Sequence, residues 1–441
     1  MTDEQALLAA ICGQPEEDTP RLAFADWLDE QGGEANSARA EFVHLQVEAA
    51  ALGRTPHPDM AKPAEVDDLT GRADALRKEF LPAWSAGWPP VLARDPAFTR
   101  GFVEHVHASG DEVRNELAVA RRFEPITGVT LEDEPESFPS FDHPVFMGIR
   151  SLGVSVRWWR SAAQRERVAS VFRGLADGER LGGVTDLALL SPVDEQAADS
   201  LTRAVSLRNV RRLTFRSIAW TAFAALADAP LFDTLEELVL DPDPPRTDRR
   251  GNWISPGRAP DLRGVVGSSR LGRLRVLRVR NARPLAVEVH ALVNSDRLPA
   301  LTTLDLSRCP IGNDGVRYLA TAPLIGRLSD LNLTATRVSG LGALAVASSP
   351  AGNLRALNLS MNLIRNDGAQ ALARSPHLRN LRFLALNWCG LSAAGGRALA
   401  EAPVLGELEE LQLEGNPGLG KAAVARLRER FGDRVWFGAD G

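Results

Sequence analysis

The chain has 441 residues, of which 44% are hydrophobic and 24% are charged, a balance typical of a folded globular protein. This composition excludes a mainly disordered or fibrous chain. The 51 basic and 57 acidic residues give a net charge of −6, so no overall basic charge is present to drive binding to nucleic acid or to a membrane surface. The length allows two or three compact domains or one extended array.

The N-terminal residues and the cysteines favour a cytoplasmic location. Residues 1–5 are acidic and no basic segment with an apolar core follows, so we expect no secretory signal peptide. We also expect no transmembrane helix, because no run of about 18 apolar residues is present. Cys12, Cys309 and Cys389 lie far apart and are too few for a disulfide framework, which favours a reducing compartment.

The first 51 residues are predicted to form three short helices. Thr2 and Gln5 fit a capping box at the start of the first helix. Thr19 fits an N-cap that is followed by proline at the first helical position of the second helix. The third helix is expected from about residue 38 to residue 50, where apolar residues recur.

The second and third of these helices carry a distinctive pair of motifs. Residues 19–30 read TPRLAFADWLDE, and residues 38–46 read ARAEFVHLQ. This pattern closely resembles the repeat-companion domain, a short bacterial module that precedes leucine-rich repeats, over residues 3–48. The resemblance implies a bacterial source and leaves the role of the module open. Residues 98–104, FTRGFVE, also resemble the stretch that joins this module to the repeats, and they alternate like a first strand.

Asp26 and Trp27 invite a functional interpretation, but we favour a structural role for both residues. Trp27 is expected to form the core of the small helical unit. Asp26 is expected to pair with an arginine such as Arg39 or to cap a helix.

Three segments are predicted to be loops. Residues 53–63 are rich in proline, glycine and histidine and are typical of a linker, and residues 132–144 are acidic and contain three prolines. Residues 241–260 form an insertion within the repeats described next, where loops often lie on the binding face, so this segment is a second candidate contact surface. The insertion holds Arg246, Arg249, Arg250 and Trp253.

A 27-residue repeat decides the architecture. The pattern L-x-x-L-x-L recurs from Leu274 onward at spacings of 26 or 27 residues, and one more step of 27 reaches Val435, in a predicted last strand. The repeat is clear from about Val184, and degenerate copies occur as far back as about Phe98. The first leucines of the regular copies are Leu274, Leu301, Leu328, Leu354, Leu381 and Leu408.

Each repeat is predicted to form a strand, a turn and a helix. The leucine pattern alternates as a half-buried strand does, and prolines such as Pro323 and Pro350 stand where a helix must end. The ninth position from the first leucine holds Cys309, Thr336, Asn362, Cys389 or Asn416. Its side chain is expected to turn inward and bond neighbouring backbone, so Cys309 and Cys389 are interpreted as structural.

This unit resembles the leucine-rich repeat, specifically the ribonuclease-inhibitor-like subtype. The resemblance implies an α/β solenoid of horseshoe form, with parallel strands on the concave side and helices on the convex side, preceded by a small α-helical module. We therefore divide the chain into a helical module (1–51), a linker and helix (52–97), degenerate repeats or an N-terminal cap (98–183) and the solenoid (184–441).

Motifs for catalysis or for cofactor binding are missing from the sequence. No G-x-x-x-x-G-K-[ST] loop, H-E-x-x-H or C-x-x-C motif is present, and His105 and His107 alone do not make a metal site. We predict no enzyme activity, no cofactor and no metal. An enzyme without a recognisable motif is an alternative.

The concave face of the predicted solenoid offers a binding surface. Strand residues that alternate with the leucines are mostly polar, basic around Arg278 and acidic around Glu410. Phe383 and Trp388 are interpreted either as aromatic anchors for a partner or as local packing. The predicted partner-binding residues are Arg275, Arg278, Arg280, Asp305, Asn332, Asn358, Met361, Phe383, Trp388 and Glu410.

The function that these features favour is a non-enzymatic scaffold that binds a protein partner through the solenoid. The resemblance to ribonuclease inhibitor and to Ran GTPase-activating protein implies the alternative of a regulator of an enzyme such as a GTPase or nuclease. We expect no nucleic acid or membrane partner. The identity of the partner and the oligomeric state are open.

Overall fold

The computed structural model describes most of the chain, in two compact units, residues 1–188 (unit 1) and residues 189–441 (unit 2). The described residues are 2–53, 64–134, 137–156, 162–218, 220–241, 246–247, 253–254, 262–284 and 286–438. The predicted linker at 53–63 lies outside them except for Gly53.

Unit 1 begins with the expected helices, although the prediction that Thr19 is the N-cap of the second helix is wrong, because Thr19 is its first helical residue and Asp18 is the N-cap. Thr2 and Gln5 form the predicted capping box, because the Thr2 hydroxyl accepts from the Gln5 backbone N–H and the Gln5 side chain accepts from the Thr2 N–H. The third helix is longer than the expected 38–50, and a further long helix follows it. The helices are α1 (Asp3–Gly13), α2 (Thr19–Gln31), α3 (Glu34–Leu52), α4 (Ala64–Trp84) and α5 (Pro90–Ala93).

Helix α3 carries apolar side chains on two sides and contributes to two hydrophobic cores. On one side Val43 packs with Phe24 of α2 and with residues of α1. On the other side Phe42 packs with Leu69 of α4. Trp27 is only partly buried and packs at the edge of the first core, so the expected core role of this residue is met in part.

Buried arginines link the helical module to the strands that follow it within unit 1. Arg39 donates from Nη2 to Glu124 Oε1 at 2.8 Å, and its guanidinium lies 4.8 Å from the ring centre of Phe98. Arg21 pairs with Glu104 in the same way. The prediction that Asp26 pairs with Arg39 or caps a helix is wrong: Asp26 is exposed within α2, and its carboxylate lies 3.8 Å from His44 Nε2.

The strands of unit 1 start with a hairpin. Strands β1 (Phe98–Thr99) and β2 (Phe102–Val103) pair antiparallel around Gly101, so residues 98–104 are not the single strand that their alternation predicts. Parallel strands follow, with Val129 opposite Leu152. The remaining elements are β3 (His105–Ala108), α6 (Gly110–Asn115), α7 (Leu117–Ala120), β4 (Gly128–Asp133), β5 (Ser151–Val156), α8 (Ala162–Asp177) and β6 (Asp186–Leu189).

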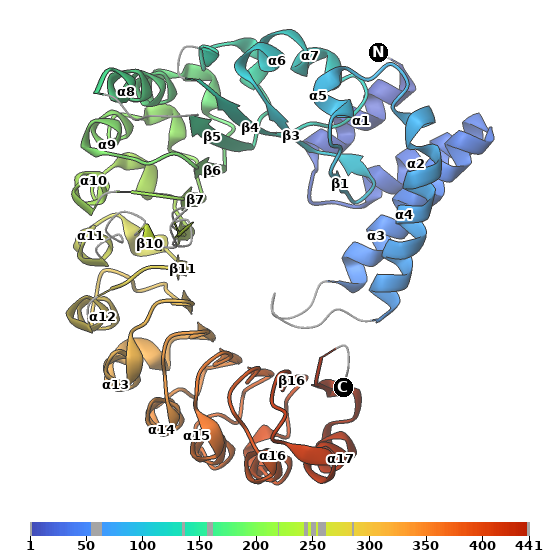
Figure 1. Cartoon of the computed structure of the whole chain (residues 1–441). Coiled ribbons are helices and arrows are strands. Elements are labelled where there is room, and N and C mark those ends of the chain that lie inside the picture. The colour runs from blue at the N-terminus through green and yellow to red at the C-terminus, as the bar shows by residue number, and fades with distance from the viewer. Residues whose placement is uncertain are drawn as a thin grey trace. The chain divides into compact units, whose positions relative to one another are not determined.

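Unit 2 is a regular array in which parallel strands line one side and helices line the other (Figure 1). Its elements are α9 (Glu195–Leu201), β7 (Arg212–Phe215), α10 (Trp220–Leu226), β8 (Glu237–Leu240), β9 (Arg246–Thr247), β10 (Trp253–Ile254), α11 (Leu262–Gly267), β11 (Val276–Val279), α12 (Ala286–Val293), β12 (Thr303–Asp305), α13 (Gly312–Thr321), β13 (Asp330–Asn332), α14 (Gly340–Ser348), β14 (Ala356–Asn358), α15 (Arg365–Ala373), β15 (Phe383–Ala385), α16 (Ala393–Ala400), β16 (Glu410–Gln412), α17 (Gly420–Phe431) and β17 (Val435–Trp436).

The strand register follows the leucine spacing. The second leucine of each repeat lies opposite the second leucine of the next, from Leu277 and Leu304 through to Leu411. The last strand is present at Val435, as predicted, but Val435 lies opposite Leu411, not opposite Leu408. The final repeat therefore closes three residues earlier than a 27-residue step requires.

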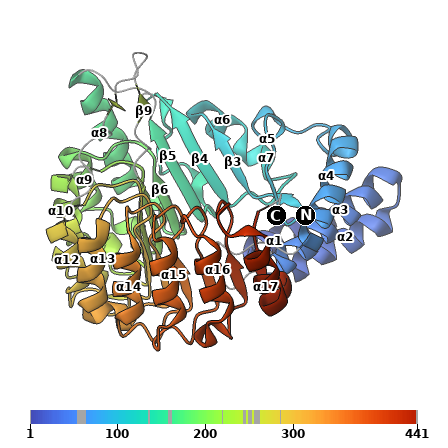
Figure 2. The ribbon, with the colours of Figure 1, turned by 60° about the horizontal axis from the view of Figure 1, so that its bottom comes forward.

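The helices α12 to α17 stand side by side in a row (Figure 2). Each of α13 to α16 ends two or three residues before a proline, such as Pro323 after α13, as the sequence predicts. In the insertion, β9 and β10 pair antiparallel. The side chains of Arg246 and Trp253, together with Arg249 and Arg250, lie outside the described residues.

The ninth position of the repeat turns inward, as predicted. Asn362 Oδ1 accepts from the backbone N–H groups of Thr336 and Val338, and its Nδ2 donates to backbone carbonyls. Cys309 and Cys389 are fully buried, and their thiols donate to the carbonyls of Val279 and Leu359 at 3.2 and 3.3 Å. Burial raises the pKa of each of the two thiols to about 12.

Candidate partner-binding surface

We call the side of unit 2 that its parallel strands form the strand face. Ion pairs between neighbouring strands lie on this face at β7, β8 and β11. Glu237 on β8 accepts from Arg278 Nε of β11 at 2.9 Å and from Arg212 Nε of β7 at 3.0 Å. Partial burial alone raises the pKa of Glu237, but the hydrogen bonds and charges of the two arginines outweigh it and hold the pKa below its usual value. This carboxylate therefore stays ionised and joins three neighbouring strands.

The predicted basic zone is largely neutralised by these and similar contacts. Arg280 Nε donates to Asp305 Oδ2 at 2.7 Å, and Arg280 Nη1 lies 3.9 Å from Asp241. Asp305 is buried, and its other oxygen accepts from the backbone N–H of Ser307. Arg275, which directly precedes β11, is exposed. The sequence pattern missed this pairing because the acidic partners lie in neighbouring repeats, 25 to 41 residues away.

Farther along the array, the predicted polar residues support their own turns. Asn332 Oδ1 accepts from the backbone N–H of Thr334, and Asn358 Oδ1 accepts from that of Ser360. Glu410 is buried and accepts from Gln412 Nε2 at 2.6 Å. The strand side chains of β14 to β16 are buried, so the mostly polar face that the sequence predicts is not open to solvent at these strands.

The two aromatic candidates differ in exposure. Phe383 is only 1% exposed, so its place is in local packing, and the anchor interpretation fails for this residue. Trp388 is 58% exposed in the turn after β15, where its ring lies over Gly415 of the next repeat. Met361, at the equivalent position one repeat earlier, is also 58% exposed.

Exposed apolar side chains gather in the repeats around these two residues. Five of the eleven large hydrophobic residues that are exposed in the described part of the chain fall between residues 341 and 388. They are Leu341, Leu344, Met361, Leu363 and Trp388. Leu341, Leu344 and Leu363 line a depression of about 450 Å³ between α14 and α15, together with Arg365 and Asp367. The leucine pattern does not predict this depression, because these residues lie outside the repeated positions.

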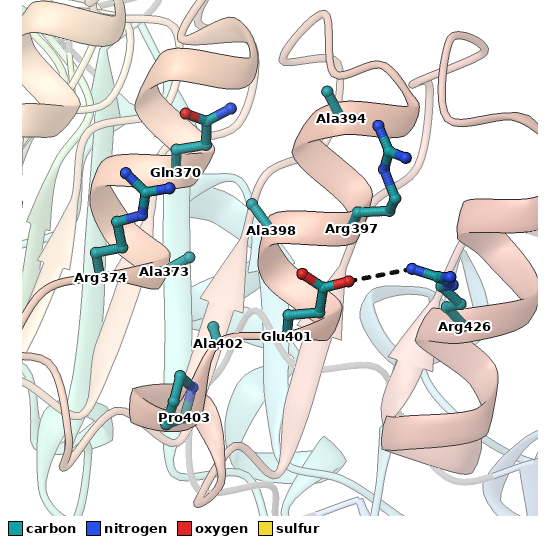
Figure 3. A pocket seen from close by; sticks show the side chains of 10 residues that line it. All are labelled: Gln370, Ala373, Arg374, Ala394, Arg397, Ala398, Glu401, Ala402, Pro403 and Arg426. Atoms are coloured by element: carbon teal, nitrogen blue, oxygen red, sulfur yellow. Dashed lines mark hydrogen bonds and ion pairs between the residues drawn. The ribbon is translucent and has the colours of Figure 1, made fainter.

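A second depression, of about 540 Å³, lies between helices α15, α16 and α17 (Figure 3). It is lined by small residues such as Ala394 and Ala398 and by the polar residues Gln370, Arg374 and Arg397. Glu401 of α16 and Arg426 of α17 form an ion pair at 3.1 Å on one side of it, whereas Arg397 extends away from them.

Neither a metal cluster nor a membrane span emerges from the residues that the structure describes. No three His, Cys, Asp or Glu side chains among them are placed to share a metal ion. His105, one of the two histidines considered above, has its Nε2 at 2.8 Å from Thr130 Oγ1, and burial lowers its pKa to about 4. No described helix is both long and apolar enough to cross a membrane.

Comparison with known proteins identifies the repeats. The family model described as a leucine-rich repeat matches residues 298–320, 353–373 and 377–400, so the chain contains leucine-rich repeats. No curated protein matches the sequence.

Two solved structures resemble the chain distantly. An internalin from Listeria monocytogenes is 14% identical, with a TM-score of 0.36, over 76% of this chain and 87% of that chain. A protein from Bacteroides fragilis is 12% identical, with a TM-score of 0.33, over 78% of this chain and 83% of that chain. Both likenesses are too weak to bear on function.

Proposed function

We propose that this protein is a non-enzymatic scaffold that binds a protein partner through its leucine-rich repeats. The observation that carries the proposal is the cluster of exposed apolar side chains from Leu341 to Trp388, in three consecutive repeats. Exposed apolar groups that are concentrated in one region mark interaction surfaces, whereas isolated ones do not. The mechanism is surface complementarity without turnover.

The strand face contributes mainly to orientation in this proposal. Arg278 and Arg280 already have acidic partners, so a bound protein gains little energy by contacting them. Arg275, which is exposed, remains available to steer a charged partner. The polar residues Asp305 and Asn332 then act by holding the strand face in shape.

The N-terminal part of the proposal concerns residues 3–48. We propose that they are a repeat-companion module of a bacterial cytoplasmic protein, followed by a connecting helix, degenerate repeats and the solenoid from about residue 184. The motifs at 19–30 and 38–46 support this assignment, and so does the packing of α3 against α1 and α2.

Site-specific crosslinking tests the proposed function. The photoreactive residue benzoylphenylalanine replaces Leu344 on α14 in the full chain, and Val205, which is exposed in a distant repeat, is replaced in the matched control. We expect one protein to crosslink at Leu344 and not at Val205. The purified partner should then bind saturably, and the intact masses of both proteins should stay unchanged. Covalent conversion of the bound protein, or the absence of any saturable partner, contradicts the proposal.

A further inference from the structure

The turns that follow strands β12 to β15 stand side by side along unit 2. Backbone hydrogen bonds join each turn to the next: Arg308 N donates to Thr334 O, Met361 N to Asn387 O and Trp388 N to Glu414 O, each at 2.7 Å. Equivalent positions in consecutive repeats therefore align in columns. We call Arg308, Arg337, Met361, Leu363, Arg365 and Trp388 the turn patch.

The turn patch carries uncompensated positive charge. The side chains of Arg308, Arg337 and Arg365 are exposed, and within the described part of the chain none of them has an ion pair or a hydrogen bond. The turn sequences SRCPIG, TATRVS, SMNLIR and NWCGLS contain no acidic residue. Asp367, in the first turn of α15, is the acid that lines the adjoining depression. Arg278 and Arg280 of the strand face, by contrast, are paired with carboxylates.

Most residues of the turn patch also hold a backbone conformation that favours glycine. Their φ angles are 59° at Arg308, 61° at Arg337, 59° at Met361, 54° at Arg365 and 56° at Trp388. Side chains with a Cβ disfavour this region. The fold accepts glycine at equivalent positions, since Gly415 aligns with Trp388 and Gly312 with Arg365, both at positive φ. Such strained positions cluster at sites of function.

The charged and apolar parts of the turn patch adjoin each other. The side chains of Leu363 and Arg365 both come within 4 Å of the position that a Cβ would occupy at Gly390. Both side chains also line the depression that holds Leu341 and Leu344. A ligand that enters this depression with an apolar group therefore places its neighbouring groups beside guanidinium groups.

We infer that the turn patch binds an acidic polypeptide segment of the partner protein that presents aliphatic or aromatic side chains. Carboxylates of the segment pair with the guanidinium groups of Arg308, Arg337 and Arg365, which favour such planar bidentate partners. An apolar side chain of the segment fills the depression beside Leu363. Nucleic acid fits less well, because it has no aliphatic side chain for this depression. The inference rests on the proposed function and specifies the surface and the chemistry of the partner.

Selection of peptides by the full chain tests the inference. A phage library of random peptides is selected on the immobilised protein, and the affinities of the selected peptides are measured by fluorescence anisotropy. We expect sequences that combine Asp or Glu with Leu, Ile or Phe. Arg365→Glu should weaken their binding about tenfold or more, and added salt should weaken it too. Arg317→Glu, the same charge reversal on the outer side of α13, should change the affinity less than about twofold.

Glycine variants separate binding from folding. Arg308→Gly and Arg365→Gly should weaken peptide binding, because they remove the guanidinium groups. They should nevertheless raise the urea midpoint of the protein, because glycine adopts a positive φ without the strain that a Cβ causes. Ala335→Gly, at φ 55° in the same column as Arg308, should raise the midpoint without changing the affinity. A lower midpoint in Arg308→Gly shows that the side chain is structural and overturns the inference.

Other outcomes also overturn the inference. Selected peptides without acidic residues, or an affinity that Arg365→Glu leaves unchanged, refute the turn patch as an acidic-segment site. Binding of a single-stranded oligonucleotide that is lost in Arg365→Glu assigns the surface to nucleic acid instead. If the crosslinked partner binds wild type and these variants equally, the turn patch is refuted while the proposed scaffold function stands.

Discussion

Removal of the buried amide of Asn362 tests the physical basis of the repeat. Its Oδ1 accepts from Thr336 N at 3.1 Å and from Val338 N at 2.9 Å. Its Nδ2 donates to the carbonyls of Leu333, Leu359 and Ser360 at 2.7 to 3.2 Å. In Asn362→Ala the two buried N–H groups lose their acceptor.

The size of the stability loss in Asn362→Ala depends on which backbone groups keep a hydrogen-bond partner. Leu333 O still accepts from Thr336 Oγ1, and Leu359 O still accepts from Cys389 Sγ, so the loss falls mainly on the two N–H groups. An orphaned buried donor costs about 1–3 kcal/mol, which gives a loss of about 2–6 kcal/mol in the free energy of unfolding. Asn362→Cys should lose less, because a thiol is a weak donor and a weak acceptor.

The assay is urea denaturation of the full chain, combined with hydrogen exchange of the Thr336 and Val338 amides. The matched control is Asn353→Ala, since Asn353 is exposed and makes one hydrogen bond, to Gly326 O at 2.6 Å. This control should lose less than about 1 kcal/mol. The reasoning is refuted if the two variants lose the same stability, or if the two amides stay equally protected in Asn362→Ala.

Two further predictions concern buried ionisable groups. Burial raises the pKa of Glu124 to about 7, although the charge of Arg39 opposes the rise. Between pH 4.5 and 7 the Glu124 carboxyl is therefore protonated in the folded state and ionised in the unfolded state. The stability of unit 1 should fall as the pH rises through this range, because the folded state binds more protons. This pH-dependent contribution to the free energy of unfolding is at most about 3 kcal/mol. Glu124→Gln should abolish it, which urea midpoints measured at several pH values will show. A wild-type pH profile identical to that of the variant contradicts this prediction. Burial raises the pKa values of Cys309 and Cys389 to about 12, so these thiols should react with a thiol reagent at pH 8 only after unfolding. Cys12, whose pKa burial also raises, is only half-buried and should react first. Equal rates for all three thiols in the folded protein refute this assignment.

The leucine spacing alone predicts the solenoid, because each strand repeats the same apolar positions. Leu304 lies opposite Leu331, and the inward turn of Asn362 follows from its place in the repeat. The capping box at Thr2 is equally local, since it needs only residues three apart. Such features depend on neighbours along the chain or on a fixed period, and a sequence displays both.

Tertiary structure decided which side chains remain available. Phe383 and Glu410 occupy strand positions that the pattern assigns to an open face, yet both are buried. Arg278 forms an ion pair with Glu237, 41 residues away, so its charge is not free to attract a partner. Leu363 follows no repeated pattern, yet it meets Leu341 of the preceding repeat in one depression. Exposure and pairing depend on side chains that the fold brings together from different repeats, and no local pattern encodes those distances.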